Sequence, residues 1–72
     1  MKDYIERMMN ERDALCDKID KLSKGVVKFG IYLPKRGALM QSQLHAMKNY
    51  LFFLEERIHY ELSLEEKTIE EV

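Results

Sequence analysis

This chain of 72 residues has few residues that could cross-link a small protein or interrupt its helices. Its one cysteine, Cys16, excludes an internal disulfide, and no spacing of cysteine and histidine resembles a zinc site. Proline occurs once, glycine three times and tryptophan not at all. A domain this short buries only about 60% of its unfolded surface and usually needs additional stabilisation, such as a disulfide, a metal or oligomerisation. The sequence therefore predicts that oligomerisation supplies the missing stability.

Long apolar runs are also missing. The longest one, Tyr50 to Leu54, is far shorter than the roughly 20 residues that a membrane-spanning helix needs. Residues 1–10 are charged and lack the apolar core of a signal peptide. We therefore expect a soluble, intracellular protein without a membrane partner.

Signatures of catalysis and metal binding are missing as well. There is no glycine-rich phosphate loop after a strand, and no Ser/His/Asp set with supporting context. His45 and His59 share a helix but lie about 21 Å apart, so they cannot bind one metal within a subunit. Glu55 and Glu56 diverge around the helix and do not form an acid/base pair. We predict no enzymatic activity, no metal and no cofactor.

Two amphipathic helical patterns are present. The stronger one repeats apolar residues at alternating steps of four and three, which is typical of a helix packed on another helix. Its members are Met40, Leu44, Met47, Leu51, Leu54 and Ile58. An earlier stripe consists of Ile5, Met8, Leu15, Ile19 and Leu22. The patterns predict an all-α fold in which residues 1–64 form a two-helix antiparallel hairpin, with helices over 4–24 and 38–64.

Glycine and proline set the expected ends of these helices. Gly25 predicts the end of the first helix, while Pro34 and Gly37 delay the second. Residues 25–37 are predicted to form an apolar, extended connection that packs as a lid on the hairpin or against a neighbouring subunit. Pairing with a second copy as a ribbon is an alternative. Residues 65–72 are expected to be an acidic tail that continues the helix weakly or frays.

The second helix has more apolar surface than one partner helix can cover. Tyr50, Phe52 and Phe53 crowd the turns that also carry the inner stripe. A helix that is apolar on several sides must be buried on several sides. We therefore predict a homo-oligomer in which these three aromatic residues form the assembly surface.

Charge is distributed unevenly, although the net charge is only −1. Residues 18–48 contain seven basic residues and one acid, whereas residues 61–72 contain five acids and one lysine. The middle of the chain can therefore attract an anion, unless its lysines only solvate an outer face. DNA is disfavoured as a partner because the helices are long, the connection is apolar and the net charge is negative.

A small anionic ligand fits the residues better. Tyr4 and Arg7 lie one helical turn apart and offer an aromatic plane beside a guanidinium group, which suit a base and a phosphate. Lys21 lies too far along the helix to meet Tyr4 in the same chain, but in an antiparallel assembly Tyr4 of one subunit can approach the lysines of another. The alternative is a solvated basic patch beside a packing tyrosine.

The segments MKDYIERMMNERDALCDKIDKL, LPKR and LMQSQLHAMKNYLFFLEERI resemble small helical-hairpin proteins of phages and prophages. That group is similar to the viral cyclic-nucleotide sponges that act against the CBASS and Thoeris immune systems. In the second half the matching positions are Pro34, Arg36, Leu39, Ser42, Gln43, Leu44 and Tyr50. Gly37 stands where the sponges carry an acid, and Gln43 stands where they carry a lysine.

The resemblance implies a compact homo-oligomer whose pockets between subunits sequester immune messengers without cleaving them. The implied ligand is a cyclic di- or oligonucleotide or a molecule of the cyclic ADP-ribose type. Tyr4 would stack on a base, Lys18 or Lys21 would hold a phosphate, and Arg36, Ser42 and Gln43 belong to the matched motif. An alternative function is a protein-binding antagonist or accessory factor that uses the aromatic face of the second helix on a host protein. A third interpretation is a structural oligomer without a ligand.

Overall fold

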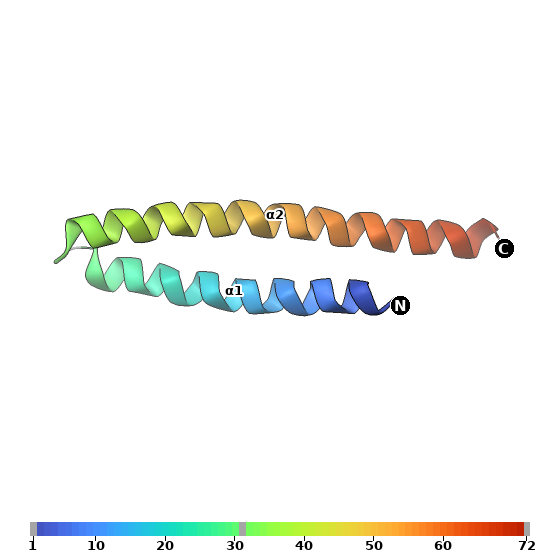
Figure 1. Cartoon of the computed structure of the whole chain (residues 1–72), viewed down its shortest axis with the longest axis horizontal. Coiled ribbons are helices and arrows are strands. Elements are labelled where there is room, and N and C mark those ends of the chain that lie inside the picture. The colour runs from blue at the N-terminus through green and yellow to red at the C-terminus, as the bar shows by residue number, and fades with distance from the viewer. Residues whose placement is uncertain (1, 31, 72) are drawn as a thin grey trace.

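A computed structural model of the chain describes residues 2–30 and 32–71. It contains two helices, α1 (Asp3–Phe29) and α2 (Pro34–Glu71), and no strand within the described residues. The helices run antiparallel along a rod with extents of 60 × 15 × 13 Å, and α2 extends past the start of α1 (Figure 1). In the described part of the chain, no helix combines the length and apolarity needed to span a membrane. The predicted all-α hairpin is confirmed.

The predicted inner stripes form the contact between the two helices. Ile5 and Met8 of α1 pack with Leu54 and Ile58 of α2 in one buried cluster, and Leu44 is buried nearer the connection. These are the buried apolar side chains among the described residues. Each contributes roughly 1.5–3 kcal/mol, whereas ordering each residue's backbone costs about 1–2 kcal/mol. The core of a single hairpin is therefore small for its length.

Two tyrosines connect the helices along one flank. The Tyr4 hydroxyl donates a hydrogen bond to Glu61 Oε2 at 2.6 Å, and the Tyr50 hydroxyl donates to the carboxylate of Glu11. Hydrogen bonding to Glu61 raises the pKa of Tyr4 above its usual value, and hydrogen bonding to Glu11 raises the pKa of Tyr50. Both bonds join residues far apart in the sequence, so they help to hold the register of the hairpin.

Both helices extend further toward the connection than the sequence predicted. The expected end of the first helix at Gly25 is wrong, because α1 continues to Phe29. The expected start of the second helix at residue 38 is also too late, because α2 begins at Pro34. Proline suits the first position of a helix, where a backbone N–H would have no partner and its fixed φ is already helical. The predicted extended lid over residues 25–37 is thus replaced by a short turn, in which Ile31 lies outside the described residues.

Close helix packing explains why two of the glycines lie inside helices. A Cβ atom on Gly25 would lie 2.7 Å from Met40 Cε, so the missing side chain makes room for Met40. A Cβ atom on Gly37 would lie 2.6 Å from Gly30 Cα, where the two backbones meet. Gly37 is buried. These contacts offset the conformational entropy that glycine loses in a helix.

The α2 helix also continues through most of the predicted acidic tail. Its last residue is Glu71, so the expected boundary at residue 64 is too early, and Val72 lies outside the described residues. The backbone N–H of Lys2 donates to Glu65 Oε1 at 3.0 Å, which ties this turn to the start of α1. No glycine or proline after residue 64 interrupts the helix.

The glycine contacts predict opposite effects for two alanine substitutions. Gly37→Ala places a methyl group against the Gly30 backbone, and such overpacking costs roughly 1–3 kcal/mol. Gly25→Ala meets only the flexible end of Met40 and gains about 0.5–1 kcal/mol of helix stability. Thermal unfolding followed by circular dichroism should therefore show a lower Tm for Gly37→Ala and an equal or higher Tm for Gly25→Ala. A Gly37→Ala variant as stable as wild type would contradict the close contact.

The tyrosine pairs predict a stability loss in alkali. Because the pKa values of Tyr4 and Tyr50 are raised on folding, their contribution is complete below the unfolded pKa of about 10. It is lost as the pH rises through the folded values. Urea unfolding across this range should show a Tyr4→Phe/Tyr50→Phe variant that is less stable than wild type at neutral pH, with the difference shrinking in alkali. Tyr32→Phe, at an exposed tyrosine of the turn, is the control, and a difference that does not change with pH would refute the assignment.

Candidate functional site

One flank of the hairpin carries a seven-residue repeat from each helix. Residues seven apart lie on nearly the same face of a helix. The repeat on α1 consists of Tyr4, Glu11, Lys18 and Gly25, and the repeat on α2 consists of Arg36, Gln43, Tyr50 and Arg57. Tyr50 bonds Glu11, and Lys18 and Gln43 line the same groove, so the two repeats face the same side.

Near the connection this flank is hollowed by two open grooves that meet at Met40 and Gln43. Each has a volume of about 480 Å³, and together we call them the basic groove. The part between the helices is lined by Lys18, Lys21, Leu22, Gly25, Met40, Gln43 and Met47. The part nearer the turn is lined by Leu33, Pro34, Lys35, Arg36, Leu39, Met40 and Gln43. The antiparallel fold thus joins cations from residues 18–21 to cations from residues 35–36.

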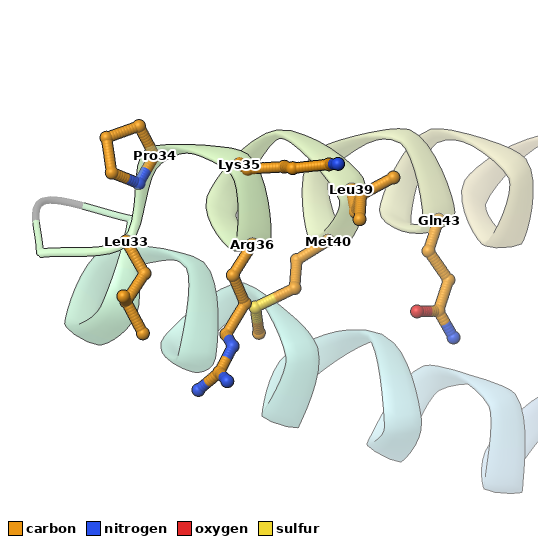
Figure 2. Close-up of a pocket in the computed structure, with 7 residues that line it drawn as sticks. All are labelled: Leu33, Pro34, Lys35, Arg36, Leu39, Met40 and Gln43. Carbon is orange, nitrogen blue, oxygen red and sulfur yellow. The ribbon is translucent and has the colours of Figure 1, made fainter.

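Figure 2 shows how α2 contributes to the part nearer the turn. Arg36, Met40 and Gln43 reach from α2 toward α1, whereas Lys35 extends along α2. The three are spaced at steps of four and three along the helix, which places them on one side of it. Met40 also contacts α1 at Gly25, so its thioether forms an apolar floor between the polar groups. The groove therefore combines a soft apolar surface with guanidinium and amide donors.

The charged side chains that line the basic groove are all positive. Its lining includes four cationic side chains, Lys18, Lys21, Lys35 and Arg36, and no carboxylate. Among the described side chains the ion pairs involve Arg12, Lys21 and Lys24, so Lys18 and Arg36 are not neutralised there. The Lys21 ammonium lies 3.1 Å from Asp17 in an exposed pair. Such a pair is weak, so Lys21 can exchange its partner for a ligand at little cost.

The structure brings some of the predicted site residues together and separates others. Lys18, Lys21, Arg36 and Gln43 line the basic groove, whereas Ser42 is exposed on α2 and is not in its lining. Tyr4 and Arg7 lie near the other end of the rod, and both are exposed. The fourteen residues between Tyr4 and Lys18 span about 21 Å of helix. A ligand in the basic groove can therefore meet Tyr4 only on another copy of the chain.

Sequence reasoning missed part of the lining. The charge pattern includes Lys35 among the basic residues without assigning it to a site, and the apolar repeat assigns Met40 and Met47 only to the contact between helices. The available signal for Lys35 was its place beside Arg36 in the LPKR segment. For the methionines, the signal was a long flexible side chain at the edge of a seam, which leaves part of the thioether accessible.

The chemistry of the groove lining suits the binding of an anion. Its polar side chains are cations and an amide, and no histidine or carboxylate lines it. Within the part of the chain that the structure describes, no three His, Cys, Asp or Glu side chains are placed to hold a metal. Four cations around an apolar floor can hold phosphate groups and cover a flat ring.

Comparisons with known proteins support a binding role. No curated protein and no solved structure matches the chain. One family model does match, over residues 2–60, a span that includes α1, the turn and the α2 residues of the basic groove. Its description, Sequestin, suggests sequestration. The resemblance inferred from the sequence is confirmed at this level: the chain belongs to the Sequestin family.

Proposed function

We propose that this protein is an immune-evasion protein of the phage type that binds cyclic nucleotide messengers and sequesters them intact. The observation that carries the proposal is the basic groove, in which cations from both helices surround an apolar floor without an opposing carboxylate. Membership of the Sequestin family supports sequestration. The class of ligand comes from the resemblance to viral sponges and from the chemistry of the groove.

The phosphates of the ligand are assigned to the cationic side chains. Arg36 offers a planar fork of N–H donors that matches a phosphate, while Lys18 and Lys21 offer compact positive charges on the facing helix. Gln43 supplies amide groups where the two parts of the groove meet. A cyclic dinucleotide carries two phosphates in a ring. The groove offers cations on both helices, Lys18 and Lys21 on α1 and Lys35 and Arg36 on α2, which suit two phosphates.

Enclosure of the ligand requires a second chain. Ligand sites usually bury 70–90% or more of a small molecule, whereas both parts of the basic groove are open to solvent on one hairpin. Tyr4 of another subunit is the candidate for stacking on a base, because it cannot reach the groove of its own chain. The active form is therefore a homo-oligomer, in the host cytoplasm where such messengers act.

Sequestration without chemistry is consistent with the groove lining. Cleavage of a phosphodiester needs a positioned base, a nucleophile or a metal. The basic groove lacks histidine and carboxylate side chains. A bound messenger should therefore be recovered unchanged when the protein is denatured.

The alternative function, antagonism of a host protein, is favoured by a different observation. Phe52 and Phe53 are exposed by 57% and 63%, and their rings contact each other edge to face. Exposed aromatic side chains are typical anchors of protein interfaces. In that case the protein should retain a host protein through purification, and a charge at Phe52 should release it without changing the oligomer.

The main prediction is a ligand-dependent increase in thermal stability. A ligand that binds only the native state stabilises it by about 2.7 kcal/mol at 100 times its Kd. Purified protein should be titrated with cyclic di- and trinucleotides and cyclic ADP-ribose isomers while its Tm is followed. At least one should raise the Tm, and chromatography of the denatured mixture should return it intact. No shift with any of them at high concentration would reject the proposal.

Two substitutions locate the binding site. Arg36→Ala removes a charged donor worth roughly 1.5–3 kcal/mol, so we expect about tenfold or greater weakening in affinity. Lys48→Ala removes an exposed cation of the same helix that is not in the groove lining, and it should bind like wild type. Equal losses in both variants would indicate a diffuse charge effect and contradict the assigned groove.

A further inference from the structure

The α2 helix carries a second, exposed seam next to the face that packs on α1, and Gln43 and Tyr50 at its near edge still reach toward α1. Leu39, Ala46, Phe53 and Tyr60 recur every seven residues along it. Gln43, Tyr50, Arg57 and Leu64 recur at the same interval and alternate with the first four at steps of four and three. This spacing is the pattern of a helix that packs on another helix. We call these eight positions the outer seam.

Exposure and shape both indicate that the outer seam is built to receive a helix. Leu39, Phe53 and Tyr60 are each 63% exposed, which is unusual for large apolar side chains in one row. Packed helices insert a side chain into a hole formed by residues i, i+3, i+4 and i+7 of the facing helix. Phe53, Glu56, Arg57 and Tyr60 have this spacing and surround a hollow on α2.

The hollow nearer the turn has the same construction. Its α2 lining includes Arg36, Leu39, Met40 and Gln43, again at positions i, i+3, i+4 and i+7. The two hollows lie near opposite ends of the outer seam. A helix that lies over both therefore runs along α2 over about 39 Å, given 26 residues from Leu39 to Leu64.

The charge of α2 identifies the partner and its direction. Residues 34–54 contain three basic residues and no acid, whereas residues 55–66 contain five acids and one arginine. A second α2 placed antiparallel opposes each basic end to an acidic end, while a parallel copy opposes like charges. We propose that the outer seam binds the outer seam of a second copy in an antiparallel, two-fold symmetric pair.

This pairing brings the partner's α2 to the edge of the basic groove, so the partner's carboxylates face its cations when no ligand is bound. The register that uses the whole seam places Leu39 opposite Leu64 of the partner subunit, and Tyr50 opposite Phe53 of the partner subunit. Gln43 then lies opposite Tyr60 of the partner subunit, at the point where both parts of the basic groove meet. Tyr60 becomes an aromatic wall of the neighbour's groove. Its role toward a ligand rests on the proposed function, but the interface itself does not.

The interface is tested first without any ligand. Light scattering should give the wild type a mass that is an even multiple of 8.6 kDa. Phe53→Lys should reduce the mass at least twofold while circular dichroism still reports a helical hairpin. Phe52→Lys is the matched control, because Phe52 is adjacent and similarly exposed but lies outside the outer seam. A monomeric wild type, or equal masses for the two variants, would overturn the proposal.

Direction and register are tested by photo-cross-linking. Benzoylphenylalanine in place of Tyr60 should cross-link to residues 36–46 or 18–25 of the partner chain, as mapped by mass spectrometry. The same group in place of His59, an exposed neighbour outside the seam, should not. Cross-links confined to residues 53–64 of the partner would show a parallel pair and overturn the proposal, as would none at all. A correct map together with no binding of any cyclic nucleotide would reject the proposed function alone.

Discussion

The structure depends on one constraint: α2 has two apolar seams, and α1 can cover only one of them. The inner seam contacts α1 and supplies the small buried core around Leu54 and Ile58. The outer seam leaves Phe53 and Tyr60 largely exposed. A 72-residue rod with this little buried surface has few other sources of stability. The proposed assembly of copies and the proposed binding site therefore both follow from the same surplus of apolar surface.

Charge is also distributed unevenly along the rod, and this favours one orientation for a second copy. The end near the turn is basic and contains Lys18, Lys35 and Arg36, while the opposite end of α2 is acidic. The basic end attracts an anion, and the acidic end keeps carboxylates away from the groove of its own chain. The same separation of charge favours an antiparallel neighbour. One uneven distribution of charge thus bears on both the ligand and the arrangement of subunits.

The period of the apolar residues was enough to predict the hairpin, but not the ends of its helices. A repeat at steps of four and three decides which faces are buried, whatever the neighbouring turns do. Gly25 and Pro34 have two meanings, since glycine can end a helix or admit a close neighbour and proline can break a helix or begin one. Which applies depends on tertiary contacts, such as Met40 against Gly25, that a sequence does not show.

For the site, composition located the cations, and the antiparallel fold decided which of them meet. Lys18 and Arg36 line one groove only because α2 returns along α1, whereas Tyr4 lies in the first turn of α1, far from the connection. Binding at a groove closed by a second subunit favours the assembled state, and by reciprocity assembly raises affinity for the ligand. In the proposed oligomer of this small hairpin, the coupling would let a bound cyclic nucleotide strengthen the assembly that holds it.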